Sequence, residues 1–90
     1  MSTYYDLGKG YKIGIPHFYC LEYCEGDKKM FVEMDFRESF SILDPILITH
    51  WEKPYECIEI DISEKKRILQ NIREFLLIEM PSRSIIMENM

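Results

Sequence analysis

The feature that most restricts the fold is a short polar turn flanked by two alternating runs. Apolar residues occupy every second position on both sides of this turn, and the turn contains the pair Gly26–Asp27. A Gly-Asp pair between two alternating runs is typical of a tight β-hairpin. We therefore predict two antiparallel strands, over residues 18–24 and 29–36, joined at this turn.

A turn at this place fixes the register and sorts the side chains of the hairpin into two faces. The predicted core face holds the apolar residues Tyr19, Leu21, Tyr23, Met30, Val32 and Met34. The opposite face is mixed and holds Phe18, Cys20, Glu22, Phe31, Glu33 and Asp35. Since cross-strand neighbours lie about 5 Å apart, we expect the three carboxylates of this second face to lie close together.

Weaker patterns predict further strands. One strand is predicted over residues 9–15, where apolar residues occupy alternate positions before Pro16. Another is predicted over residues 42–50, where Ile46 and Ile48 alternate with Leu47 and Thr49. Residues 57–60 predict a fifth short strand. Residues 84–87 either add a last strand or pack over the sheet.

One helix is predicted after Asp61. This residue is a suitable N-cap because Glu64 follows three positions later, and Ser63 is the alternative cap. Residues at helical spacing form a single stripe, made of Ile68, Leu69, Ile72, Phe75, Leu76 and Glu79. Pro81 ends the pattern.

Strands followed by a helix indicate an α+β fold. We expect an antiparallel sheet of four to six strands with one amphipathic helix packed on one face. A chain of 90 residues is too short for two cores, so residues 1–90 are predicted to form a single domain.

Charge is unevenly distributed along the chain. The formal net charge is −5, but residues 17–61 carry eleven acidic side chains against four basic ones, a net charge of −7. This sign argues against a nucleic-acid binder and against attachment to anionic lipid. The acidic segment either solvates an exposed face or meets a basic protein partner. For such a partner, the candidate contacts are Glu22, Glu33 and Asp35, followed by Phe31, Glu25 and Asp27.

The sequence offers little for catalysis. His17 and His50 have no recognisable nucleophile or carboxylate partner, and Glu33 with Asp35 is more typical of a solvated pair. His17 with Cys20 and Cys24 lacks a fourth metal ligand. We therefore predict no enzyme activity, no metal and no cofactor; a small enzyme using either histidine is the remaining alternative.

The expected compartment is the cytoplasm. No run of about 18 apolar residues predicts a membrane span. The start of the chain, residues 1–6, lacks the basic and apolar parts of a signal peptide. An odd number of cysteines, three, is also a poor disulfide framework.

A longer pattern covers about the second half of the chain. Its residues are Trp51-x-x-Pro54-Tyr55 and then Ile60-x-Ile62-Ser63-x-x-Lys66-x-Ile68-Leu69-x-Asn71-Ile72. This pattern resembles the immunity protein 74 family of bacterial polymorphic toxin systems. A second proline often follows the tryptophan in that family, whereas Lys53 stands before Pro54 here.

The resemblance implies a small cytoplasmic protein that neutralises a neighbouring toxin by direct, stoichiometric binding. Toxins of such systems frequently end in basic nuclease domains, so the partner is expected to be basic. Trp51, Pro54 and Tyr55 are interpreted as a structural corner between sheet and helix. Two alternatives remain open: a general interaction module or homodimeric regulatory subunit, and an interface on the basic helix face formed by Lys65, Lys66, Arg67 and Arg73.

Overall fold

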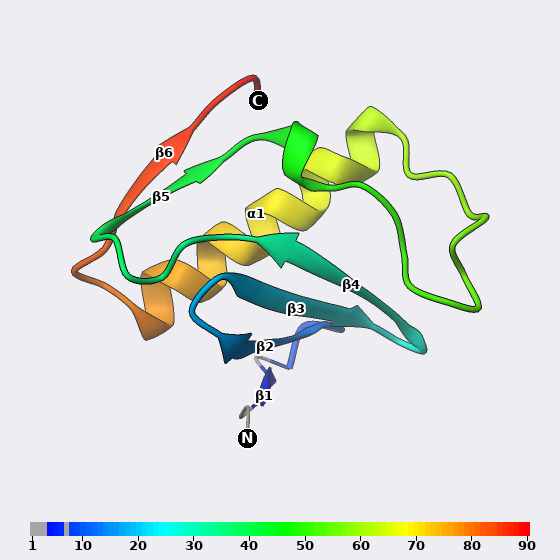
Figure 1. Ribbon diagram of the computed structural model, residues 1–90, viewed down its shortest axis with the longest axis horizontal. Coiled ribbons are helices and arrows are strands. Elements are labelled where there is room, and N and C mark those ends of the chain that lie inside the picture. The colour runs from blue at the N-terminus through cyan, green and yellow to red at the C-terminus, as the bar shows by residue number, and fades with distance from the viewer. Residues whose placement is uncertain (1–3, 7) are drawn as a thin grey trace.

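A computed structural model describes residues 4–6 and 8–90. The elements are β1 (Tyr4–Asp6), β2 (Lys12–His17), β3 (Cys20–Glu25), β4 (Lys28–Glu33), β5 (Phe40–Leu43), a short 3-10 helix (Pro45–Leu47), α1 (Ile62–Glu79) and β6 (Ser84–Met87). Strands β1-β2-β3-β4 form an antiparallel sheet in this order, and β5 and β6 form a separate parallel pair (Figure 1). The predicted α+β class, with an antiparallel sheet and one helix, is confirmed. The first three residues, on which the signal-peptide expectation partly depends, lie outside the described residues.

The predicted hairpin register is confirmed. Leu21 pairs with Val32, Tyr23 pairs with Met30 and Glu25 pairs with Lys28. The apolar side chains of these pairs are buried, as expected for a face turned toward the core.

Tyr19 was expected on the core face, and this is wrong. The chain turns at residues 18–19, before β3 begins, so the Tyr19 ring is 49% exposed. The guanidinium of Arg37 lies 4.5 Å from the centroid of this ring. The ring therefore contributes to the surface, although the Tyr19 carbonyl still accepts a hydrogen bond from the N–H of Met34.

The N-terminal strand β1 was not predicted. It pairs with β2, and its Tyr4 lies opposite Gly14. A Cβ at Gly14 would lie 3.1 Å from the Tyr4 ring, so a glycine here lets the ring lie close to the sheet. The next residue of β1, Tyr5, faces the other way, and its ring centroid lies 5.3 Å from that of Phe75 on α1.

Two strand predictions are wrong. The predicted strand over 42–50 ends at Leu43 because Asp44 caps a 3-10 helix: its Oδ1 accepts a hydrogen bond from the N–H of Ile46, and Pro45 starts the helix. Residues 57–60 form no strand, because the segment before them closes into local turns. The N–H of Tyr55 donates to Glu52, and the N–H of Ile58 donates to Tyr55.

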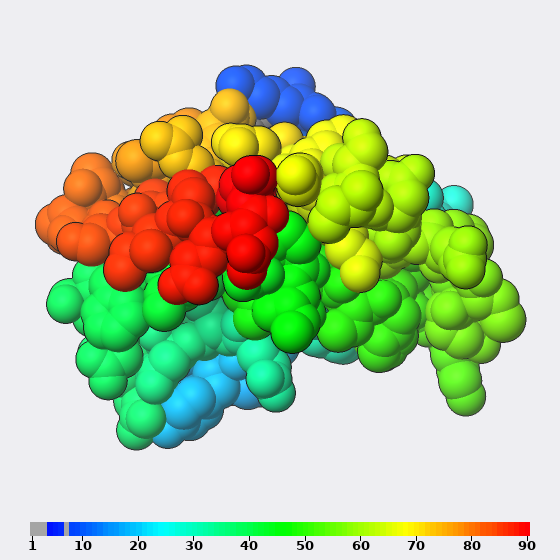
Figure 2. Space-filling view, turned by 90° about the horizontal axis from the view of Figure 1, so that it is seen from above, coloured from blue at the N-terminus to red at the C-terminus, as the bar shows by residue number. Residues whose placement is uncertain are grey.

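The last strand, β6, lies parallel to β5, with Ile42 beside Ile86. A parallel pair needs a long crossover connection, and here the connection contains α1. Figure 2 shows the C-terminal segment lying beside the middle of the chain, and the segment before α1 standing out as a lobe.

Helix α1 begins as predicted, with Asp61 as its N-cap: the Oδ1 of Asp61 accepts from the N–H of Glu64 at 2.8 Å. The helix ends at Glu79, two residues before Pro81. Its buried residues are Ile68, Leu69, Ile72, Phe75 and Leu76, which belong to one core cluster together with buried residues of β2, β3, β4 and β5. Within the described residues, none of the helices combines the length and the apolar character needed to cross a membrane.

Candidate functional site

The face of the sheet turned away from α1 is defined by the strand register. One row across it contains Tyr4, Gly14, Glu22 and Phe31, and the next row contains Asp6, Lys12, Cys24 and Lys29. The sequence-predicted residues Glu22, Phe31 and Glu33 share this face. Because Lys12 and Lys29 also lie on it, the face is less acidic than the net charge of the whole segment suggests.

Glu22 is the least accessible of the predicted contacts. It is only 6% exposed, and its carboxylate lies 3.9 Å from the ammonium of Lys29. A carboxylate that is this little exposed and already faces an amine offers little surface to a partner. Phe31, its partner on β4, is 41% exposed, so a partner reaches this side chain where it does not reach Glu22.

Glu25 lies at the end of β3 and is held by the helix. Its carboxylate accepts hydrogen bonds of 2.6 and 3.0 Å from the guanidinium of Arg67, and it also accepts one from the hydroxyl of Tyr23. Burial raises the pKa of Glu25, but the bonds from Arg67 and Tyr23 outweigh it, so the net shift is downward. The charge of Glu25 is thus used within the fold, whereas Asp27 is exposed in the hairpin turn.

A second region brings predicted and unpredicted residues together. A hollow of about 230 Å³ lies between the end of β4 and β5, and we call it the acidic groove; it is lined by Glu33, Met34, Asp35, Glu38, Phe40, Ser41, Ile42 and Leu47. The side chains of Glu33 and Glu38 are exposed. Phe40 is 40% exposed and Ile42 is 41% exposed. Carboxylates therefore lie beside accessible apolar side chains in this groove.

Asp35 in the acidic groove is held locally by Arg37. Its Oδ1 accepts from the backbone N–H of Arg37 at 2.9 Å, and the guanidinium of Arg37 lies 3.3 Å away. Hydrogen bonds from the Arg37 side chain and backbone lower the pKa of Asp35, so this carboxylate stays charged to lower pH.

The sequence reasoning missed Glu38, Phe40 and Ile42 as site residues. Residues 40–43 alternate between exposed and buried, which is a strand signal, but the prediction started the strand at residue 42. Moving its start back by two residues would have placed Phe40 and Ile42 on the same face.

An apolar surface continues from the acidic groove onto the β5–β6 pair. Ile42 lies beside Ile86, which is 44% exposed, and Ile46 after β5 is 77% exposed. Neighbouring exposed apolar residues of this kind mark interaction surfaces more often than isolated ones do.

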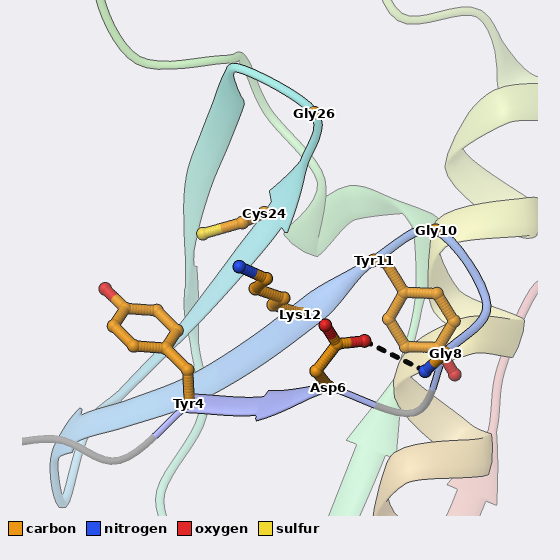
Figure 3. A pocket seen from close by; sticks show the side chains of 8 residues that line it. All are labelled: Tyr4, Asp6, Gly8, Gly10, Tyr11, Lys12, Cys24 and Gly26. Atoms are coloured by element: carbon orange, nitrogen blue, oxygen red, sulfur yellow. Dashed lines mark hydrogen bonds between the residues drawn. The ribbon is translucent and has the colours of Figure 1, made fainter.

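Another hollow, of about 680 Å³, lies at the other end of the sheet and is lined by Tyr4, Asp6, Gly8, Gly10, Tyr11, Lys12, Cys24 and Gly26 (Figure 3). The carboxylate among these lining residues, that of Asp6, accepts a hydrogen bond from the N–H of Gly8 at 2.9 Å. Burial and the nearby Glu22 raise the pKa of the Cys24 thiol, against the opposing effect of Lys29 and Lys12. The thiol is thus protonated at neutral pH and is not an activated nucleophile.

The histidines have separate local partners. The Nδ1 of His17 accepts from the N–H of Tyr19 at 3.3 Å, and the Nε2 of His50 lies 3.4 Å from Glu52. Over residues 4–6 and 8–90, no three His, Cys, Asp or Glu side chains gather in a way that could hold a metal ion.

Trp51 of the predicted structural corner is fully buried, and its ring lies 6.4 Å from that of Tyr23. The ammonium of Lys28 lies 4.8 Å from the Trp51 ring. Tyr55 is half-buried against the core, whereas Pro54 is exposed. Another residue of the sequence pattern, Asn71, donates a hydrogen bond of 2.8 Å to the hydroxyl of Tyr23.

In comparisons with protein-family models, with curated proteins and with solved structures, the chain has no match. The resemblance to the immunity protein 74 family accordingly stays a prediction.

Proposed function

We propose that this chain is an immunity protein, of the type represented by the immunity protein 74 family, that neutralises a cognate bacterial toxin domain by direct binding. The family assignment is supported by the pattern from Trp51 to Ile72. In this proposal Trp51 and Asn71 serve the fold, since both contact Tyr23 in or beside the core.

The observation that carries the proposal is the composition of the acidic groove. Exposed carboxylates of Glu33 and Glu38 lie beside the accessible side chains of Phe40 and Ile42. Apolar side chains supply buried area in an interface, and charges at its rim select a partner of opposite charge and speed its approach. This combination fits a basic protein surface.

Burial and ion pairing reduce the number of predicted residues that are able to contact a partner. Glu22 is buried beside Lys29 and Glu25 is bound to Arg67, so neither carboxylate is free to make a first contact. Glu33 and Asp35 remain candidates within the groove, and Phe31 remains one beside it. Asp27 lies apart, in the hairpin turn.

The proposed mechanism is occlusion without chemistry. A nuclease-type toxin binds phosphates through basic residues, and carboxylates at matching positions compete for the same residues. Each bound immunity protein then inactivates one toxin domain, for as long as the complex lasts. The rate of dissociation, more than the rate of association, would set the degree of protection.

The decisive experiment is co-expression with the C-terminal domain of the protein encoded directly upstream of this chain, which the proposal expects to be toxic. We expect cells that carry both genes to grow, and the two purified proteins to form a complex of one to one stoichiometry by isothermal titration calorimetry. Toxin activity that persists in the presence of excess purified chain, with no heat of binding, contradicts the proposal.

The apolar β5–β6 surface favours a second candidate, a homodimeric regulatory subunit. Ile42, Ile46 and Ile86 on this surface would be covered by the same surface of a second copy. Light scattering distinguishes the two candidates, because a stable dimer of about twice 10.9 kDa without protection from the toxin supports this alternative.

A further inference from the structure

Strand β4 lies at the edge of the four-stranded sheet, with β3 on one side only. Just after β4, the N–H groups of Met34 and Phe36 donate to the carbonyls of Tyr19 and Phe18, on the side of the sheet where β3 begins. In an antiparallel ladder the backbone groups of alternate residues point to opposite sides. The backbone groups of the odd-numbered residues of β4 therefore point away from β3.

This free side of β4 is closed at both ends by other parts of the chain. At one end the carbonyl of Lys29 accepts from the N–H of Glu52 at 2.8 Å. At the other end the carbonyl of Asp35 accepts from the guanidinium of Arg83 at 2.8 Å. Between these ends, no hydrogen bond within the described part of the chain uses the outward N–H and C=O groups of Phe31 and Glu33.

Strand β5 also has a free side. The carbonyls of Ser39 and Leu43 accept from the N–H groups of Ser84 and Glu88, so the odd-numbered residues of β5 face β6. Phe40 and Ile42 consequently point their backbone groups away from β6. The carbonyl of Phe40 accepts from Arg83, which also holds Asp35, so this arginine links the start of β5 to the end of β4.

Both free sides belong to segments that line the acidic groove, because Glu33 of β4 and Ile42 of β5 lie on its walls. We propose that the toxin domain supplies an extended basic segment that lies in the acidic groove and adds as a strand to the free edge of β4. This inference rests on the proposed function and specifies how the partner is recognised.

The backbone groups of Phe31 and Glu33 would pair with the added segment, as in other cases of strand addition to a sheet edge. Its side chains on one face would contact Phe31, Phe40 or Ile42. Lysine or arginine side chains of the segment would meet Glu33 and Glu38. Main-chain bonds would thus give affinity, and the alternating side chains would give specificity.

A second copy of this chain fits the edge less well. Pairing two β4 edges would place the Glu33 of each copy in the same interface, between proteins that each carry a net charge of −5. Like charges across a strand pair are destabilising, and native edges use charged residues to prevent such pairing. A basic partner would instead be attracted by these negative charges.

Amide hydrogen exchange, measured by NMR on the labelled chain with and without the catalytically inactivated toxin domain, tests the inference. We expect the N–H groups of Phe31 and Glu33 to exchange fast in the free chain and to become protected in the complex. The N–H groups of Met30 and Val32 point to β3 and serve as internal controls, slow in both states. A complex in which Phe31 and Glu33 still exchange fast overturns the inference and leaves the proposed function intact.

A matched pair of variants tests the same point by affinity. Both Glu33→Pro and Glu33→Thr remove the charge, but only Glu33→Pro also removes the outward N–H. Because this N–H points away from β3, its loss breaks no hydrogen bond between β3 and β4. We expect Glu33→Pro to bind the toxin domain at least about tenfold more weakly than Glu33→Thr. Melting curves establish that both variants fold, and equal affinities of two folded variants contradict the inference.

Two further outcomes complete the test. Absence of any complex with the toxin domain contradicts the proposed function, and this inference falls with it. Protection of Phe31 and Glu33 in the free chain, rising with protein concentration, assigns the edge to a second copy and overturns the inference.

Discussion

The carboxylate of Glu25, at the end of β3, is bound by the guanidinium of Arg67 on α1 through two hydrogen bonds of 2.6 and 3.0 Å. Forty-two residues separate the two side chains along the chain. The pair links the hairpin to the helix, and the Tyr23 hydroxyl joins it by donating to the same carboxylate.

This pair makes stability depend on pH. The pKa of Glu25 is lowered from its ordinary value of 4.5, so the folded state releases this proton more readily than the unfolded chain does. The resulting stabilisation is complete above about pH 5 and disappears as the pH falls through the lowered pKa. We expect Glu25→Gln to be less stable than the original chain at pH 7, and this difference to shrink toward pH 3. Urea unfolding at several pH values measures it, with Glu79→Gln at the exposed C-terminal end of α1 as control.

Tyr23→Phe tests the hydrogen bonds around the same carboxylate. The substitution leaves the half-buried amide of Asn71 without its acceptor, and it removes one donor from Glu25. We expect a loss of about 1–2 kcal/mol in the free energy of unfolding. Tyr19→Phe removes a hydroxyl from an exposed ring and should change stability by less than about 0.5 kcal/mol. Equal losses in the two variants would contradict this account of Tyr23.

Trp51 should be one of the most costly residues to replace. Its side chain is fully buried, and the chain has a single tryptophan. Trp51→Ala leaves a cavity beside Tyr23 and should cost about 3–5 kcal/mol. Phe18→Leu, at a 67% exposed position, should cost less than about 0.5 kcal/mol. Circular dichroism of the helix measures the unfolding of both variants, because replacing Trp51 removes the single tryptophan and its fluorescence.

Charge reversal in the acidic groove tests the proposed interface. We expect Glu33→Lys combined with Glu38→Lys to weaken binding of the toxin domain by about tenfold or more and to reduce the dependence of the association rate on salt. Glu56→Lys with Glu59→Lys makes the same change of charge in the lobe before α1 and should have a smaller effect. Surface plasmon resonance at several salt concentrations measures both, and a larger effect of the second pair would move the interface to the lobe.

Glu22→Lys should lower the stability of the folded chain, although the residue lies on the outward face of the sheet. The new ammonium group would be buried beside that of Lys29, and the ion pair between Glu22 and Lys29 would be lost. We expect a loss of roughly 1–3 kcal/mol in stability. Glu33→Lys changes an exposed position of the same face and should cost little. Chemical unfolding of both variants checks this, and a stable Glu22→Lys variant would contradict the buried position of Glu22.

Local patterns were sufficient to predict the central part of the fold. The Gly26–Asp27 turn set the register of the hairpin, and the cap at Asp61 with the apolar stripe from Ile68 set the helix. Both depend on residues close together in the sequence. The strand predicted over 42–50 failed because the capping chemistry of Asp44 and Pro45 prevailed over the alternating pattern that followed.

Local sequence patterns were enough to predict the class of the fold and the register of its hairpin, and the composition located the negative charge between residues 17 and 61. Which of those charges remain accessible depends on contacts between distant parts of the folded chain. The carboxylate of Glu25 is bound by an arginine forty-two residues away, and Glu22 is buried beside a lysine of the neighbouring strand. The groove that joins Glu33 to Phe40 and Ile42 likewise depends on where β5 lies relative to β4. Net charge is a sum over the sequence, but the ion pairs and burial that decide its availability are set by distances that exist only in the folded chain.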